Sequence, residues 1–128
     1  MIIDGKKTAA ELREKLKKKV TELKSTYNAV PGLTVILVGE DPASKIYVKN
    51  KEKFAIEVGI NSQVIKYPED VEEKVVLNKI KELNSDNKVS GILVQLPLPK
   101  HIDKRKVIET IDPVKDVDGF HPVNVGNL

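Results

Sequence analysis

An apolar run at residues 33–38 constrains the fold most, because a turn and a helix start follow it at once. A nearly continuous apolar sequence without alternation is typical of a strand that is buried on both faces of a parallel sheet. Asp41 is suited to cap the helix that follows, and Pro42 to its first position. We expect this helix to end near Val58, because Gly59 is a common helix stop. This stretch therefore predicts one strand–helix unit.

The same kind of pattern predicts three more helices and two more strands. An apolar stripe at spacings of three or four residues indicates a first helix, opened by a capping box of Thr8 and Glu11. Asp70 and Glu73 repeat the capping spacing before a third helix. The expected elements are helices opened at Thr8, Asp41, Asp70 and Asp103, the last reaching Ile111; strands at 33–38, 62–67 and 91–95; and a loop over 112–128.

The predicted order is therefore α-β-α-β-α-β-α. Strands that alternate with helical crossovers favour a parallel sheet with helices on both faces. We expect the α/β class, with an open parallel sheet in a three-layer arrangement and one domain over residues 1–128. Residues 123–128 complete no predicted element, and we therefore expect a second domain beyond them.

Composition excludes several function classes. The 22 basic and 19 acidic residues are mixed along the predicted helices, and there are two Phe, three Tyr and no Trp. Neither the basic face nor the stacking platform of a nucleic-acid-binding protein is therefore expected. There is no cysteine, which excludes thiolate chemistry and is compatible with the cytosol. No apolar run could span a bilayer and residues 1–5 form no signal core, so we expect a cytoplasmic protein without membrane contact.

The second helix places one lysine on its apolar side. On a helical wheel Lys51 lies one turn after Tyr47 and close to Ala55 and Val58, whereas the other lysines of the helix lie opposite. Such a lysine can pack its stem and extend its ammonium group to water. Because the helix starts at the carboxyl end of a strand, where parallel sheets bind ligands, we favour a second interpretation. Lys51 would then be held partly dry and would exchange protons with a substrate.

Two more polar positions follow predicted elements. Gln95 ends the third strand, where its amide could bind loop backbone or hydrogen-bond Lys51. Asp118 precedes a glycine, as in a plain turn. Asp116 and Asp118 could also form a metal-binding pair, but no third ligand lies at a useful spacing, and we expect no metal.

The first strand–helix turn does not match a dinucleotide-binding fingerprint. It holds one glycine, and Glu40 and Asp41 put two carboxylates where the pyrophosphate oxygens would lie. Neither a P-loop nor a G-x-S-x-G elbow is present. Any nucleotide used in a reaction is therefore expected to be held elsewhere.

Taken together, these segments resemble the family of methylenetetrahydrofolate dehydrogenase/methenyltetrahydrofolate cyclohydrolase, bifunctional folate enzymes of one-carbon metabolism. The resemblance to their amino-terminal catalytic domain covers essentially the whole chain, and its specificity comes from the order and spacing of several short motifs. The matching segments are Ile3-Asp4-Gly5-Lys6, Val38-Gly39-Glu40-Asp41-Pro42-Ala43-Ser44, Tyr47-Val48, Lys51, Gln95-Leu96-Pro97-Leu98-Pro99 and Lys115-Asp116-Val117-Asp118-Gly119-Phe120-His121-Pro122.

The resemblance implies roles for five residues. Lys51 would be the main catalytic group, Gln95 would tune it, and Tyr47 would position the folate and stack on it. Asp118 would anchor the pterin ring, and Leu96 would contact the substrate. The implied reactions are NADP-dependent oxidation of 5,10-methylenetetrahydrofolate to 5,10-methenyltetrahydrofolate and hydrolysis of that product to 10-formyltetrahydrofolate.

The resemblance also implies a division of labour. Residues 1–128 would be the folate-binding catalytic domain, whereas NADP would be bound by a carboxy-terminal Rossmann domain outside this sequence. The isolated domain is then expected to lack dehydrogenase activity. The intact enzyme would be a homodimer, and this domain alone a monomer. The alternative is a non-catalytic folate-binding or regulatory module of the same fold; the presence of both Lys51 and Gln95 argues against it, because binding alone requires neither.

Overall fold

The computed structural model describes residues 5–126. In chain order the elements are α1 (Gly5–Tyr27), β1 (Gly32–Val38), α2 (Pro42–Val58), β2 (Asn61–Tyr67), α3 (Glu73–Asn84), β3 (Gly91–Val94), α4 (Lys104–Thr110), the 3₁₀ helix η1 (Pro113–Lys115) and α5 (Pro122–Gly126). Within these residues, no helix combines the length and the apolar composition needed to cross a membrane.

The three strands form one parallel sheet in the order β2-β1-β3. Gly32 lies opposite Asn61 of β2, and Leu33 lies opposite Gly91 of β3. The central position of β1 explains its nearly continuous apolar sequence, because neighbours cover it on both edges and both faces. The edge strand β2 is only partly buried. The predicted α/β class and the open parallel sheet are confirmed.

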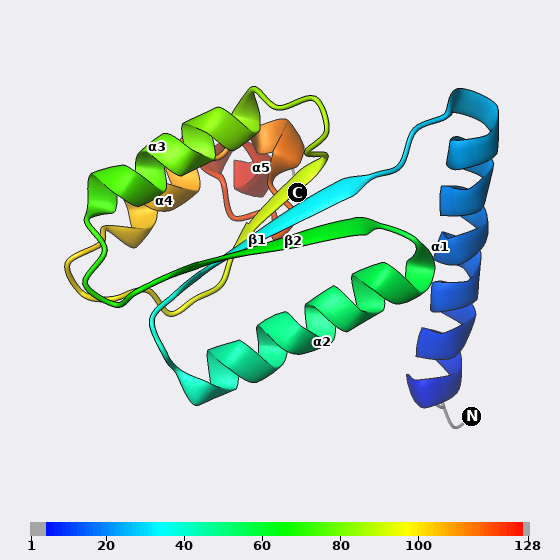
Figure 1. The fold of residues 1–128 in the computed structure, drawn as a ribbon, viewed down its shortest axis with the longest axis horizontal. Helices are drawn as coiled ribbons and strands as arrows, with labels where there is room; N and C mark the ends of the chain where they lie inside the picture. The colour runs from blue at the N-terminus through cyan, green and yellow to red at the C-terminus, as the bar shows by residue number, and fades with distance from the viewer. Residues whose placement is uncertain (1–4, 127–128) are drawn as a thin grey trace.

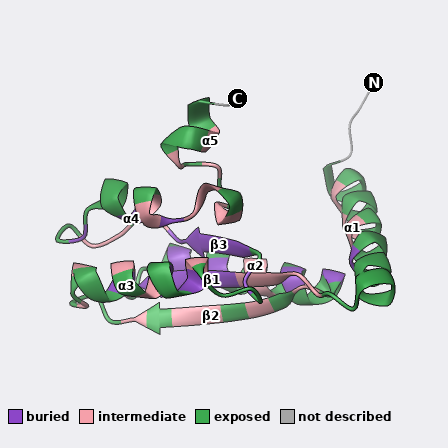
Figure 2. Ribbon diagram, turned by 90° about the horizontal axis from the view of Figure 1, so that it is seen from above, coloured by how far each residue is buried: buried purple, intermediate pink, exposed green. Residues whose placement is uncertain are grey.

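Helices cover both faces of the sheet, with α2 on one side and α3 and α4 on the other (Figures 1 and 2). Because side chains alternate across a strand, β1 contributes to two cores. Toward α2, the buried residues are Val35, Leu37, Val48 and Leu93. Toward α3 and α4, they are Ile36, Val38, Val76, Ile80, Leu83, Val89, Ile92, Val94, Ile102, Val107 and Ile111. The predicted three layers are confirmed.

Both ends of α2 follow the predicted signals. The Asp41 carboxylate accepts a hydrogen bond from the Ser44 backbone N–H at 2.8 Å, and Pro42 occupies the first turn. At the other end Gly59 has a φ of 89°, in the left-handed region that favours glycine. These caps fix the length of the helix that carries Lys51.

Two predicted helix starts are wrong. α1 already includes Gly5, so Thr8 lies within the helix and does not cap it. The two lysines before Thr8 are good helix formers, which allows the helix to begin earlier. α3 begins at Glu73 without a side-chain cap, and Asp70 lies in a turn upstream. The Glu73 carboxylate instead accepts a hydrogen bond from the Asp103 backbone N–H at 2.7 Å.

The first helix stands apart from the sheet and packs against α2 (Figure 1). Of its apolar stripe only Val20 is buried, beside the left-handed residue Gly59 that ends α2. Leu12 and Leu23 remain exposed. The stripe therefore predicted the helix but not how much of it would be covered within residues 5–126.

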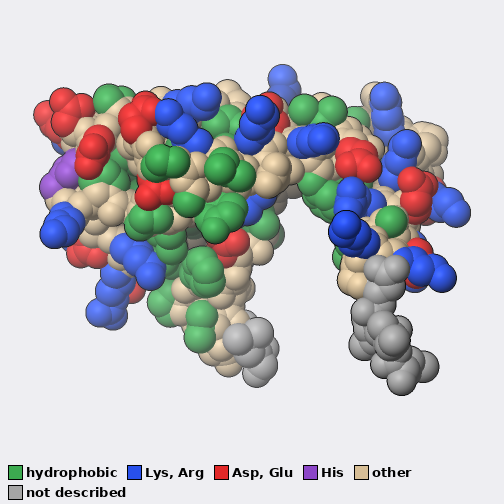
Figure 3. All heavy atoms as spheres, turned by 90° about the horizontal axis from the view of Figure 1, so that it is seen from below, with side chains coloured by type: hydrophobic (Ala, Val, Ile, Leu, Met, Phe, Trp, Pro, Cys, Tyr) green, Lys and Arg blue, Asp and Glu red, His purple; other side chains and the backbone are tan. Residues whose placement is uncertain are grey.

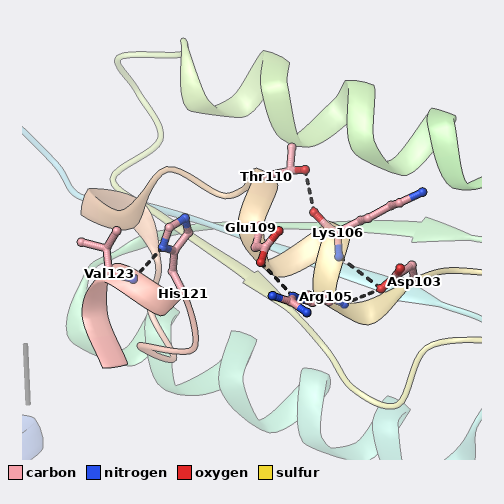
Figure 4. A network of polar contacts seen from close by, with 7 residues as sticks. All are labelled: Asp103, Arg105, Lys106, Glu109, Thr110, His121 and Val123. Atoms are coloured by element: carbon pink, nitrogen blue, oxygen red, sulfur yellow. Dashed lines mark hydrogen bonds and ion pairs between the residues drawn. The ribbon is translucent and has the colours of Figure 1, made fainter. Parts of the chain in front are cut away.

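The chain after α4 is more ordered than the predicted loop. As expected, Asp103 caps α4 by accepting from two backbone amides (Figure 4). Asp112 likewise caps η1. At the start of α5, the Nδ1 atom of His121 accepts from the Val123 backbone N–H at 3.1 Å (Figure 4). The expectation of a loop over 112–128 is thus wrong at η1 and α5, because local side-chain caps form two short helical segments, and it holds for residues 116–121. Residues 127–128 lie outside the described residues.

Candidate functional site

Lys51 and Gln95 meet in the structure, although 44 positions separate them in the sequence. The Nζ atom of Lys51 donates a hydrogen bond to Gln95 Oε1 at 2.8 Å. The Nε2 atom of Gln95 donates to the Leu96 carbonyl oxygen at 3.1 Å, which directs the amide oxygen toward the lysine. Gln95 is 8% exposed and Lys51 is half-buried, so this hydrogen bond is partly buried. The hydrogen bond anticipated between the two side chains is present.

The sheet and α2 hold Gln95 in place. β3 ends at Val94, one residue earlier than predicted, but the Gln95 backbone N–H still donates to the Ile36 carbonyl oxygen of β1 at 2.9 Å. The buried Ser44 hydroxyl, at the start of α2, lies 3.5 Å from the Leu96 carbonyl oxygen. The Leu96–Pro97 peptide bond is cis. The Leu96 carbonyl oxygen therefore accepts from Gln95 at the end of β3 and from Ser44 at the start of α2.

A cavity of about 640 Å³ lies beside this pair. Its volume is in the range of small-molecule sites. Hydrophobic side chains gather on the face that borders the hollow between α1 and the rest of the molecule (Figure 3). The residues that line the cavity, mostly with apolar atoms, are Pro31, Gly32, Leu33, Asn50, Lys51, Phe54, Ala55, Ile60, Ser90, Gly91, Leu93, Val117 and Asp118.

The position of this cavity differs in part from the expectation. Ligand sites were expected beyond the carboxyl ends of the strands, but Gly32, Leu33 and Gly91 place the floor of the cavity along the first halves of β1 and β3. A smaller cavity of about 380 Å³ does lie at the carboxyl ends, lined by Val38, Gly39, Glu40, Asp41, Glu69, Pro97, Leu98 and Pro99. The antiparallel course of α2 over the sheet brings Lys51 back toward the middle of β1, which accounts for the shift.

Asp118 lies on the wall of the large cavity, across from α2. Its side chain is exposed overall, but partial desolvation raises the pKa of the carboxyl group. The positive charge of Lys51 opposes this shift, and the negative charge of Asp116 adds to it. The cavity thus presents the Lys51 side chain and a titratable carboxyl group within electrostatic reach of each other.

Tyr47 and Leu96 are not part of the cavity lining. Tyr47 is 54% exposed, and within residues 5–126 its hydroxyl makes no hydrogen bond. The buried side of α2 runs through Ser44, Val48, Ala55 and Val58. Lys51 falls on this line, but Tyr47 lies about 60° to one side of its centre, at the flank of the helix. The helical wheel therefore placed Lys51 correctly on the buried side of α2, and Tyr47 lies at the exposed edge of that side.

The described residues offer no cluster of metal ligands, and the Gly39 turn offers no phosphate site. Among residues 5–126, no group of three or more His, Cys, Asp or Glu side chains could hold a metal ion. At the Gly39 turn, the backbone N–H of Ser44 already donates its hydrogen bond to the Asp41 carboxylate, so it is not available to a phosphate. Glu40 forms an ion pair with Lys45. This turn therefore does not fit a dinucleotide.

Sequence reasoning missed most of the apolar lining, including Phe54 and Val117. One signal was available in Gly91, the first residue of β3. A Cβ atom at this position would lie 2.6 Å from Val117 Cγ2, so glycine allows the segment before Asp118 to pack against the strand.

Comparisons with known proteins place these features in a family. A model of the tetrahydrofolate dehydrogenase/cyclohydrolase catalytic domain matches residues 3–118. The bifunctional protein FolD of Pelagibacter ubique is 70% identical over 128 residues, which are 100% of this chain and 46% of that protein. The FolD protein of Prosthecochloris aestuarii is 56% identical over 100% of this chain and 43% of its own length.

Solved structures show the same fold. The bifunctional FolD enzyme from Campylobacter jejuni superposes with a TM-score of 0.93 at 50% identity, over 96% of this chain and 43% of that one. The FolD enzyme from Trypanosoma brucei, solved with NADP cofactor and an inhibitor, gives a TM-score of 0.95 at 35% identity, over 99% and 43%. The chain spans less than half the length of the curated relatives that it matches.

Proposed function

The chain belongs to the tetrahydrofolate dehydrogenase/cyclohydrolase catalytic domain family, and on this premise we propose that residues 1–128 bind a folate and supply the catalytic lysine of a bifunctional enzyme. For the intact enzyme, the proposed reactions are NADP-dependent oxidation of 5,10-methylenetetrahydrofolate to 5,10-methenyltetrahydrofolate and hydrolysis of that product to 10-formyltetrahydrofolate. The observation that carries the proposal is the Lys51–Gln95 hydrogen bond of 2.8 Å, on the wall of a cavity that Asp118 also lines.

The cavity suits the chemistry of a folate. The amino-pyrimidine edge of a pterin offers two adjacent hydrogen-bond donors, and the Asp118 carboxylate can accept both. The flat rings of the substrate match the largely apolar lining contributed by Leu33, Phe54 and Leu93. We therefore assign Asp118 to the pterin and Lys51 to the reacting carbon beside it.

The hydrolytic step needs a group that accepts a proton from water. Water adds to the methenyl carbon, which belongs to an amidinium cation, and loses a proton. The bond from this carbon to N5 then breaks as the new hydroxyl loses its proton and N5 gains one, which leaves the formyl group on N10 and releases one proton overall. Lys51, held by Gln95 at the cavity wall, can accept the proton of the attacking water in its amine form.

NADP has no suitable place at the first strand–helix turn, where Glu40 and Asp41 are already engaged. We propose that the intact enzyme binds NADP outside this chain, and that this chain alone has no dehydrogenase activity. Homodimer formation by the intact enzyme, a monomeric state of this domain and cytoplasmic residence belong to the same proposal.

Hydrolysis is the activity to test in this chain. Incubation with 5,10-methenyltetrahydrofolate should accelerate the loss of the methenyl chromophore beyond the rate in buffer, in proportion to the chain concentration. Saturable binding without acceleration would favour the non-catalytic folate-binding module, and the absence of binding would contradict the proposed function.

Asp118 predicts a pH dependence of folate binding. Because burial raises the pKa of its carboxyl group, the carboxylate forms at a higher pH than that of an ordinary aspartate. The affinity for 5,10-methenyltetrahydrofolate should therefore rise with pH as Asp118 ionises. Asp118→Asn should weaken binding by about tenfold at neutral pH and abolish this rise. Fluorescence titrations at several pH values measure both effects.

Asp70→Asn is the matched control, because Asp70 is exposed in a turn and does not line the cavity. Its binding curve should match that of the parent chain at every pH. An Asp118→Asn variant that keeps the pH-dependent rise would contradict the assignment of Asp118 to the pterin.

A further inference from the structure

The loop that carries Asp118 connects η1 to α5. Two charged side chains, those of Lys115 at the end of η1 and of Asp116 at the start of the loop, make side-chain hydrogen bonds that attach it to α3 and to α5. Neither residue lines the large cavity. Their contacts show how an exposed loop can hold a carboxylate in a fixed place.

Lys115 attaches the start of the loop to α3. Its Nζ atom donates to the carbonyl oxygens of Leu83 and Asp86, each at 2.9 Å. These carbonyls lie at the carboxyl end of α3, where the last carbonyl groups lack helical partners and a cation is stabilised. Each carbonyl also accepts one backbone hydrogen bond, from the N–H of Asp86 and of Val89, so the lysine adds a second bond to each and fixes the chain two residues before Val117.

Asp116 organises the rest of the loop around its carboxylate. Oδ1 accepts from the Gly119 backbone N–H at 3.1 Å. Oδ2 accepts from the His121 backbone N–H at 2.8 Å and from Asn124 Nδ2 at 3.0 Å. The backbone of Asp116 also forms a parallel bridge with Ile92 of β3. The loop is thus attached to the sheet on one side and to α5 on the other.

These bonds favour the ionised form of Asp116. Desolvation alone would raise the pKa of its carboxyl group, but the hydrogen bonds from Asn124 and the loop backbone outweigh it and hold this pKa below the ordinary value. A charged acceptor makes stronger hydrogen bonds than a neutral one. At neutral pH the loop is therefore closed around a permanent negative charge.

We propose that Lys115 and Asp116 are positioning residues that fix the Asp118 carboxylate on the cavity wall. Asp118 lies inside the turn that Asp116 closes, between the bridge to Ile92 and the amide of Gly119. The two residues act on the ligand only through Asp118. This inference rests on the proposed function, because that function gives Asp118 its ligand.

Amide hydrogen exchange without ligand tests the loop itself. The Gly119 and His121 amides should exchange slowly in the parent chain, and at least about tenfold faster in Asp116→Ala, because both lose their acceptor. Asn124→Ala removes one side-chain donor and keeps both backbone bonds, so the two amides should stay protected. Unchanged exchange in Asp116→Ala would overturn the proposal, whether or not the chain binds folate.

A double-mutant cycle tests the action through Asp118. Asp116→Ala should raise the Kd for 5,10-methenyltetrahydrofolate by about tenfold in the parent chain, but by less than about twofold when Asp118 is already alanine. If Asp116→Ala raises the Kd by the same factor in both backgrounds, or changes the Kd in neither, the proposal is overturned. If Asp116→Ala does not fold, Asp116→Asn replaces it with a smaller expected effect, because the amide oxygen can still accept from part of the loop.

The lysine is tested in the same cycle. Lys115→Met should weaken binding in the parent chain and not in the Asp118→Ala background, whereas Lys100→Met, at an exposed position, should change neither. Equal weakening by Lys115→Met in both backgrounds would exclude Lys115 from the proposal. A parent chain that binds no folate would overturn the proposed function, and amide exchange would still decide whether the loop is closed by Asp116.

Discussion

Lys51→Met is expected to slow the hydrolysis of 5,10-methenyltetrahydrofolate by this chain by about 10²- to 10⁴-fold, the usual contribution of a positioned proton-transfer group. Methionine retains an unbranched apolar stem, so it should fill the same space on the buried side of α2. The fold and the affinity for folate should therefore change little. Single-turnover loss of the methenyl chromophore at saturating chain concentration measures the chemical step without the binding step.

Lys49→Met is the matched control for this prediction. Lys49 lies on the same helix, two residues away and exposed. Its removal takes away the same charge but leaves the Lys51–Gln95 hydrogen bond intact. The control should hydrolyse at the parental rate. Equal rates for Lys51→Met and the parent chain would exclude Lys51 as the catalytic group.

Gly32→Ala is expected to destabilise the chain by about 2–3 kcal/mol, the upper part of the usual range for overpacking. A Cβ atom at Gly32 would overlap the carbonyl oxygen of Lys88, which is backbone and cannot rotate away. The clash would also separate Gly32 from Ser90, to which it is joined by hydrogen bonds in both directions. Since Gly32 and Ser90 both line the large cavity, folate affinity should fall with stability.

Urea unfolding measures this effect as a lower midpoint at an unchanged slope. Gly126→Ala serves as the control, because a Cβ atom there meets open space. It should change the free energy of unfolding by no more than about 0.5 kcal/mol. A Gly32→Ala chain with the parental midpoint would show that the start of β1 is not packed against Lys88 as described.

The parts that the sequence predicted well depend on neighbouring residues. The nearly continuous apolar run of β1, in which Thr34 is the polar exception, indicates burial on both faces, and the central strand is buried in this way. Asp41, Pro42 and Gly59 act as caps within a few residues of their own positions. Lys51 could be placed because a helix of known start and period fixes which side chains share a face.

The parts that were predicted wrongly depend on how elements pack. The Thr8–Glu11 spacing fits a capping box, but nothing local prevents α1 from starting earlier. The direction of Tyr47 depends on how α2 rotates over the sheet, which only the packed core determines. Asp116 is followed by glycine three residues later, a pattern compatible with a side chain that closes a turn. Its bond to Asn124 nevertheless depends on α5, which the sequence did not predict.

A crystal structure of the chain with a bound tetrahydrofolate tests the central claim most directly. The account predicts the pterin ring in the large cavity, with its amino-pyrimidine edge on the Asp118 carboxylate. The Nζ atom of Lys51 should remain hydrogen-bonded to Gln95 and face the carbon bridge between N5 and N10. A folate bound outside this cavity, or a Lys51 side chain turned to solvent away from Gln95, would contradict the account.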